Sequence, residues 1–173
     1  VELDGHLILP EITLSIPSGA LTAVIGPNGC GKSTLLRALA RVVIPSAGTV
    51  HVGGVDAAGL RRRELSRRIS LMAQGATAPD GVTVAELVAR GRFPHQGMFQ
   101  QWSRTDEETV ARALRETGTA ELAERRVADL SGGQRQRVWL ALVLAQDAPV
   151  MLLDEPTTYL DIGHQHQLMS LVR

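Results

Sequence analysis

Apolar residues in this chain form short runs in its first half and again near residue 150. Runs of β-branched and aliphatic residues, bounded by glycine, proline or polar residues, are typical of strands. We expect strands over 7–9, 12–16, 20–25, 49–52, 69–73 and 150–153. Helix-forming stretches lie between and after these runs, over 35–40, 60–68, 83–90, 106–117 and 134–146 and from about 164. The alternation of strands and helices predicts an α/β fold.

Capping residues mark the ends of two predicted helices. Thr105 precedes three acidic residues, 106–108, which favour the positive end of a helix dipole. We therefore expect Thr105 to be the N-cap of a helix that Gly118 ends. Ser131 is the expected N-cap of the helix over 134–146.

Composition excludes several classes of protein. The chain has 173 residues, 44% of them hydrophobic, with 18 basic and 18 acidic residues. These values exclude a disordered chain and argue against a polybasic nucleic-acid binder. The longest apolar run, Val138 to Ala145, is too short to span a bilayer. A single cysteine cannot form an internal disulfide, which favours a reducing compartment.

A glycine-rich loop matches the phosphate-binding pattern G-x-x-x-x-G-K-[ST] at every fixed position. It lies between a predicted strand and a predicted helix, which is the context that this motif needs. Its backbone N–H groups and the following helix N-terminus would bind the phosphates of a nucleotide. The residues expected to bind ATP are Gly26, Pro27, Asn28, Gly29, Cys30, Gly31, Lys32, Ser33 and Thr34.

Lys32 is the only lysine, because the other 17 basic residues are arginines. A lysine ammonium is a compact charge that fits between phosphate oxygens, whereas a planar guanidinium does not. We expect Lys32 to reach the terminal phosphates and the Ser33 hydroxyl to bind Mg²⁺. Cys30, beside them, is interpreted as a small space-filling residue whose thiol could be sensitive to modification.

Two carboxylates follow the apolar run 150–153. An apolar strand that ends in carboxylates is typical of a parallel sheet, whose ligand site lies at the carboxyl ends of its strands. Asp154 is the expected Mg²⁺ partner, and Glu155 is the expected general base that acts on water. Gln74 ends another strand and would bridge the metal and the water. Glu155, Gln74 and Lys32 are thus the predicted catalytic residues.

A second helix start suited to anions lies at Ser131-Gly132-Gly133-Gln134. One nucleotide does not need two such sites in one chain. A second subunit does, if each chain closes its Ser131 loop over the nucleotide held by the Lys32 loop of the other. We therefore expect a head-to-tail homodimer with ATP sandwiched between its two chains.

These motifs together resemble those of the ATP-binding cassette ATPases. Walker A is 26–34, the Q-loop is Gln74, the signature is 130–134, Walker B is 150–155 and the D-loop is 159–161. The resemblance implies an α/β P-loop NTPase (RecA-like) core with a mixed sheet, a small N-terminal antiparallel β subdomain and an inserted α-helical subdomain. The core would comprise about 1–74 and 147–173, and the helical subdomain about 75–146. It also implies that Ser131, Gly132, Gly133, Gln134 and Asp161 bind ATP in trans.

Three segments look like the ATPase subunits of iron–siderophore importers, with cobalamin and haem importers as near relatives: 91–96, 102–108 and 155–162. The resemblance implies membrane permease subunits as partners, a substrate-binding protein as an indirect partner and no nucleic acid. It implies a peripheral location on the cytoplasmic face of the inner membrane. The segment 75–102 would contact the permease. Its apolar residues allow a second interpretation, a small satellite core of Phe93, Met98, Phe99 and Trp102.

Some positions depart from the family pattern. Leu3 stands near the place of the aromatic residue that stacks on adenine in the family. The family's switch histidine is absent, since His164 and His166 lie closer to Glu155 in the sequence than that histidine does. The chain is therefore expected to be a C-terminally truncated domain that binds nucleotide better than it hydrolyses it. The chelate cannot be identified from this chain, because in this family the permease and the binding protein choose it.

Rival functions make different predictions about the sequence. A soluble cassette ATPase acting on DNA or ribosomes would carry a large coiled-coil or basic insertion, and the helical segment here is short and not strongly basic. A non-catalytic, nucleotide-dependent interaction module would lack Glu155 or Lys32, and both are present. A small-molecule kinase would share the phosphate loop without the segment 130–134.

Overall fold

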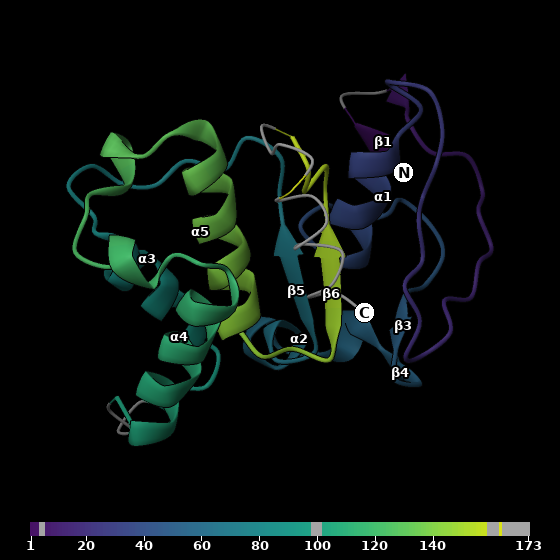
Figure 1. The fold of residues 1–173 in the computed structure, drawn as a ribbon. Helices are drawn as coiled ribbons and strands as arrows, with labels where there is room; N and C mark the ends of the chain where they lie inside the picture. The colour runs from purple at the N-terminus through teal and green to yellow at the C-terminus, as the bar shows by residue number, and fades with distance from the viewer. Residues whose placement is uncertain (4–5, 98–101, 159–162, 164–173) are drawn as a thin grey trace.

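Two parallel strands stand at the centre of the molecule with helices on both sides (Figure 1). They are β5 (Ile69–Met72) and β6 (Val150–Leu153), paired from Ile69 opposite Val150 to Met72 opposite Leu153. The parallel pairing agrees with the prediction that the run 150–153 belongs to a parallel sheet. The structure, a computed structural model, describes residues 1–3, 6–97, 102–158 and 163.

Helices form most of the remaining regular structure. On one side of the strands lie α3 (Val84–Ala89), α4 (Arg104–Glu116) and α5 (Gly132–Ala145); α1 (Lys32–Leu39) lies on the other side and α2 (Arg62–Ser66) at the foot of the strands (Figure 1). Short 3₁₀ turns are η1 (Ala57–Gly59), η2 (Arg90–Arg92), η3 (Ala120–Leu122) and η4 (Val127–Asp129). The predicted helices up to residue 146 are therefore present, with ends shifted by a few residues.

The helical side has its own hydrophobic core. Buried residues spaced three or four apart converge from α3, α4 and α5, as expected for helices with one apolar face. They include Val84, Leu87, Val88, Val110, Ala113, Leu114, Val138, Ala141 and Ala145. α5 contributes to a second cluster through another face, where Leu140 and Val143 pack with Met72 of β5. α5 is thus the helix that joins the helical side to the sheet.

The opposite face of the sheet is also covered. Leu152 of β6 and Ile69 of β5 are buried with Leu65 of α2, and Leu36 and Leu39 of α1 pack against this cluster. Burial on both faces explains why the run 150–153 is apolar at every position.

The N-caps of α3, α4 and α5 follow the S/T-x-x-D/E/Q pattern. Ser131 is the N-cap of α5 as predicted, and its side chain accepts a hydrogen bond from the Gln134 N–H. The prediction of Thr105 as an N-cap is wrong, because Ser103 caps α4 and exchanges hydrogen bonds with Asp106. Ser103 stands three residues before Asp106, the spacing at which each side chain can reach the other's backbone N–H.

The N-terminal part differs most from expectation. It has two short antiparallel pairs, β1 (Glu2–Leu3) with β2 (His6–Leu7) and β3 (His51–Val52) with β4 (Val55–Asp56). These pairs form two separate two-stranded sheets in the described residues. The predicted strand over 7–9 is thus shifted to His6–Leu7, and that over 49–52 is shortened to His51–Val52.

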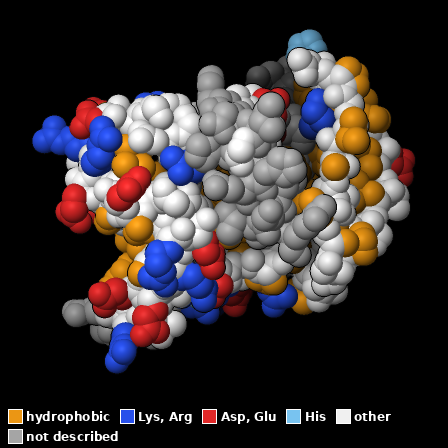
Figure 2. All heavy atoms as spheres, viewed as in Figure 1, with side chains coloured by type: hydrophobic (Ala, Val, Ile, Leu, Met, Phe, Trp, Pro, Cys, Tyr) orange, Lys and Arg blue, Asp and Glu red, His pale blue; other side chains and the backbone are white. Residues whose placement is uncertain are grey.

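Strands over 12–16 and 20–25 were also expected, and that prediction is wrong, because neither run pairs with a strand in the described residues. The apolar side chains of these runs are exposed, Ile25 to 90%, and Figure 2 shows hydrophobic side chains gathered along the same edge of the molecule. β-branched runs favour an extended backbone, but a strand also needs a ladder partner, which the pattern does not specify.

Candidate functional site

The phosphate loop wraps around the side chain of Lys32, the first residue of α1. The Lys32 ammonium donates hydrogen bonds to the carbonyl oxygens of Gly26, at 2.9 Å, and Pro27, at 2.8 Å. Cys30 Sγ lies 4.0 Å from the same nitrogen. The charge that we expect to meet a phosphate is therefore held at the centre of the loop by the loop's own backbone.

Gly31 shows why the loop needs glycine. Its φ of +96° lies in the left-handed region, and a Cβ at this position would lie 2.5 Å from Cδ2 of the buried Leu9. Both the backbone angle and the close approach exclude a side chain. Gly31 thus lets α1 start with its N-terminus directed into the loop.

Ser33 and Asp154 lie 121 residues apart in the chain and are joined in the structure. Ser33 Oγ donates a hydrogen bond of 2.8 Å to Asp154 Oδ1. Asp154 follows β6, is only 4% exposed, and its Oδ2 is buried without a hydrogen-bond partner in the described part of the chain. A hydroxyl and a carboxylate with a free oxygen are ligands that suit Mg²⁺, so this pair fits that ion.

No cluster of three His, Cys, Asp or Glu side chains that could hold a metal lies within the described residues.

Gln74 and Glu155 also meet at the carboxyl ends of the strands. Gln74 Nε2 donates a hydrogen bond of 2.6 Å to Glu155 Oε2, and Thr158 Oγ1 lies 3.4 Å from the same oxygen. Glu155 has a φ of +50°, a left-handed conformation that is costly for a residue with a side chain. A strained backbone held by surrounding contacts is often found at functional sites.

Residues 131–134 of the signature segment 130–134 begin α5 at the same end of the molecule as the carboxyl ends of the strands (Figure 1). Ser131 and Gln134 form a capping box, in which the side-chain oxygen of each accepts a hydrogen bond from the backbone N–H of the other. Ser131 and Gly132 are exposed. Within the described residues no hydrogen bond or ion pair links this segment to the phosphate loop of its own chain. An exposed helix start, separate from the loop, is compatible with a role in a second chain.

Several predicted residues lie outside the described part of the chain, namely Met98, Phe99, Tyr159, Leu160, Asp161, His164, His166 and the side chain of Leu3. Phe93 and Trp102 are described, and they are 61% and 46% exposed. These two exposures argue against the predicted satellite core, whose other two members lie outside the described residues.

Sequence reasoning missed Gln136. This half-buried residue of α5 donates from Nε2 to the carbonyl oxygens of Pro156, at 3.1 Å, and Glu155, at 3.4 Å. The spacing of residues along the helix could have indicated its position, because Gln136 precedes the buried Leu140 and Val143 by four and seven residues and so lies on the same face of α5. A polar side chain on that face must meet a polar partner across it.

A buried ion pair was missed as well. Arg92, 4% exposed, donates from Nε to Asp106 Oδ1 at 2.8 Å and from Nη1 to the Ala145 carbonyl at 2.9 Å. Burial of Asp106 opposes its charged form, but hydrogen bonds from Ser103 and Arg92 outweigh this and hold the pKa of the carboxyl below its usual value. The pair links η2, α4 and the C-terminal end of α5.

The arginine-rich segment 61–68 exposes Arg61, Arg62, Arg63 and Arg67, as expected for a solvated helix face. Two of its side chains have a further partner, because Arg63 Nε and Arg67 Nε donate to the Pro94 carbonyl at 2.9 and 2.7 Å. These bonds fix the loop that follows η2 to α2 and thereby present Phe93 at the surface.

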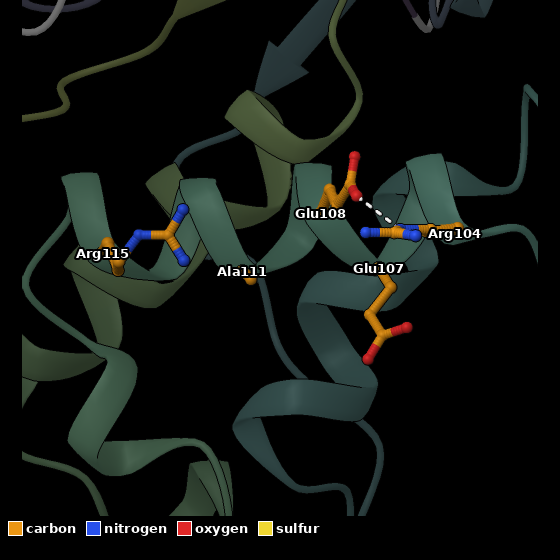
Figure 3. A pocket seen from close by; sticks show the side chains of 5 residues that line it. All are labelled: Arg104, Glu107, Glu108, Ala111 and Arg115. Carbon is orange, nitrogen blue, oxygen red and sulfur yellow. Dashed lines mark hydrogen bonds and ion pairs between the residues drawn. The ribbon is translucent and has the colours of Figure 1, made fainter.

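A shallow hollow of about 350 Å³ lies elsewhere, along the exposed face of α4 (Figure 3). One helix alone lines it, through Arg104, Glu107, Glu108, Ala111 and Arg115. Its Arg104–Glu108 ion pair, at 2.9 Å, is an ordinary surface pair one turn apart.

No helix in the described ranges is long and apolar enough to cross a membrane.

Comparison with known proteins shows the family of this chain. A family model described as ABC transporter matches residues 9–158. The ferric enterobactin transport ATP-binding protein FepC of Escherichia coli K12 is 53% identical over 167 residues, which cover 96% of this chain and 62% of that protein. This chain therefore spans a little under two thirds of the length of that relative.

Two solved structures are similar in fold. A putative metal-chelate type ABC transporter in an inward-facing conformation matches with a TM-score of 0.73 and 33% identity, over 91% of this chain and 58% of that one. A dimeric bacterial ABC transporter cassette matches with a TM-score of 0.84 and 27% identity, over 95% and 73%. The fold is thus that of a P-loop NTPase cassette with mixed α and β structure. The chain belongs to the ABC transporter family.

Proposed function

We propose that this chain binds ATP with Mg²⁺ and hydrolyses it as the ATPase subunit of an importer for iron–siderophores or related metal chelates. The observation that carries the proposal is the bond between Ser33 and Asp154. It joins the phosphate loop to the carboxylate after β6, and it leaves a buried carboxylate oxygen without a partner. A phosphate site and a metal ligand are the two parts that phosphoryl transfer needs first.

Each residue of the site has a distinct role in this proposal. The N–H groups of 26–34 bind the phosphates, and the ammonium of Lys32 exchanges loop carbonyls for phosphate oxygens. Ser33, Asp154 and Gln74 would hold Mg²⁺, which would neutralise charge on the phosphates. Glu155 accepts a proton from the attacking water, and Gln74 orients the Glu155 carboxylate through the hydrogen bond between them.

The second half of the site comes from another copy of the chain. Ser131, Gly132, Gly133, Gln134 and Asp161 bind the nucleotide held by the phosphate loop of the partner. The exposed start of α5 and the similarity to a dimeric cassette support this arrangement. Because the signature contacts favour ATP over ADP, ATP binding closes the dimer and hydrolysis opens it. About 1–74 and 147–173 form the core that binds nucleotide, and about 75–146 form the helical subdomain.

The subunit composition and location of the whole transporter are proposed from the relatives. FepC is named as a ferric enterobactin transport protein, and one similar structure is that of a metal-chelate type transporter. We place this chain beneath membrane permease subunits, on the cytoplasmic face of the inner membrane, with a substrate-binding protein as an indirect partner. The exposed Phe93 and Trp102 lie on the segment that contacts the permease. Uptake of ferric siderophores, haem and cobalamin by the complete complex would identify the cargo.

The proposal is tested with the full-length protein and Mg-ATP. Lys32→Ala should weaken ATP binding by at least about tenfold, because it removes the charge at the centre of the loop. Glu155→Gln should bind ATP normally, lose turnover and accumulate as an ATP-bound dimer in gel filtration. Arg115→Ala, on the far face of α4, is the control and should behave like the wild type. Unchanged affinity in Lys32→Ala, or a Glu155→Gln protein that stays monomeric with Mg-ATP, would refute the mechanism.

A further inference from the structure

Gln136 connects the helix that begins at the signature segment with the turn that carries Glu155. Its Nε2 donates to the carbonyl oxygens of Pro156 and Glu155, at 3.1 and 3.4 Å. An amide NH₂ group has two hydrogens, so one side chain can serve both carbonyls. The contact crosses from α5 to the segment after β6 and is the most direct link between the two in the described residues.

The position of Gln136 follows from the packing of α5 on the sheet. Leu140 and Val143 lie on the same helical face and pack against Met72 of β5. Gln136 stands one turn before Leu140, toward the N-terminus of α5, which lies beside the carboxyl ends of the strands (Figure 1). The apolar contacts thus hold α5 on the sheet, and Gln136 reaches the first residues beyond it.

The turn that Gln136 contacts has a strained backbone at Glu155. Asp154 still takes part in the ladder through its N–H, which bonds to the Met72 carbonyl at 3.0 Å. The next residue, Glu155, turns into the left-handed region with a φ of +50°. The Glu155 carbonyl accepts from the Thr158 N–H, at 3.2 Å, and from Gln136, so two donors hold this conformation.

We propose that Gln136 is a positioning residue for Glu155. By holding the carbonyls of Glu155 and Pro156, it fixes the strained turn so that the carboxylate meets Gln74. It also makes the direction of that carboxylate depend on the position of α5, the helix whose start binds nucleotide in trans. This inference rests on the proposed function, in which Glu155 is the general base.

The test compares two glutamines of the same helix in the full-length protein. Gln136→Met keeps the length of the side chain and removes its hydrogen bonds, and Gln136→Glu keeps the shape but has no N–H to donate. Gln146→Met is the matched control, because Gln146 also donates to two carbonyls, those of Ser66 and Ile69, at the far end of α5. Turnover of Mg-ATP, direct ATP binding and amide hydrogen exchange are measured for each.

We expect both Gln136 variants to lose about tenfold or more in kcat, with ATP affinity and KM within about twofold of the wild type, because a small displacement of a catalytic group is costly. Exchange at the Thr158 amide should rise in both. Gln146→Met should keep the wild-type kcat and Thr158 exchange.

Wild-type kcat in both Gln136 variants, or an equal loss of kcat in Gln146→Met, would overturn the inference and leave the proposed function standing. A wild-type protein without ATP turnover would instead overturn the proposed function. Unchanged exchange at the Thr158 amide in the Gln136 variants would overturn the inference that Gln136 holds the turn, whether or not the wild type hydrolyses ATP.

Discussion

Asp106 is a buried carboxylate whose charge is balanced by Arg92 and by the hydroxyl and N–H of Ser103. Both members of the ion pair are almost inaccessible, so neither can be solvated if the other is removed. Loss of one partner from such a pair typically costs about 3–5 kcal/mol, because an unpaired charge remains buried. The pair therefore secures the joint of η2, α4 and α5, although it takes no part in the proposed chemistry.

We predict that Asp106→Asn lowers the free energy of unfolding by about 3–5 kcal/mol at pH 7, measured by chemical denaturation. The folded-state pKa of Asp106 is below its usual value, so its contribution is fully present above the unfolded-state pKa of about 3.9. That contribution is lost as the pH falls through the lower, folded-state pKa. The difference in stability between wild type and variant should therefore shrink below about pH 4.

Glu108→Gln is the matched control for this experiment, because Glu108 makes an exposed ion pair on the same helix. We expect it to change stability by less than about 1 kcal/mol. A difference between wild type and Asp106→Asn that stays constant down to pH 2 would contradict the role given to the charge of Asp106.

At the scale of elements, the helices and the central parallel strands could be predicted from the sequence. Their signals are local, such as the cap at Ser131 and the apolar run of β6. The prediction of a strand over 20–25 was wrong because the sequence pattern reports a side-chain preference for extended backbone and does not identify a neighbouring strand to pair with. Thr105 failed as a cap because two hydroxyl residues compete within one turn, and only Ser103 reaches Asp106 from the right distance.

η2 and α5 approach each other closely at Gly91. A Cβ built on Gly91 would lie 2.5 Å from the Leu142 carbonyl oxygen and 3.1 Å from the Gln146 nitrogen, both backbone atoms. Backbone cannot yield as a side chain can, so Gly91→Ala must separate the two elements. We predict a loss of about 1–3 kcal/mol in unfolding free energy. Gly59→Ala, also in a 3₁₀ turn but with open space around it, should change stability by less than about 1 kcal/mol. Equal stabilities of the two variants in urea unfolding would refute the close packing.

At the scale of the molecule, the site is assembled from distant parts of the chain. The motifs 26–34 and 150–155 were recognisable, but the bond between Ser33 and Asp154 spans 121 residues and could only be expected from the family resemblance and the chemistry. Gln136 and Gln146 could not be assigned partners from sequence, because a glutamine on a helix face does not show what lies opposite. α5 connects these parts, with Ser131 at its start and Gln146 at its end.

Gln146 joins the helical side of the molecule to the sheet side. Its side-chain Nε2 donates to the carbonyls of Ser66 and Ile69, at 2.6 and 2.9 Å. Its backbone carbonyl oxygen lies 2.8 Å from His95 Nε2. A carbonyl that loses its hydrogen-bond donor costs about 1–3 kcal/mol, so we predict that Gln146→Met loosens this joint where the C-terminal end of α5 meets α2, while Leu140 and Val143 keep the rest of the helix packed on Met72. Amide exchange at Arg67 and Arg68, at the end of α2, should become faster. Gln136→Met is the reciprocal control and should leave these two amides as protected as in the wild type. If exchange at Arg67 and Arg68 is the same in Gln146→Met and wild type, the two sides are held together by apolar packing alone.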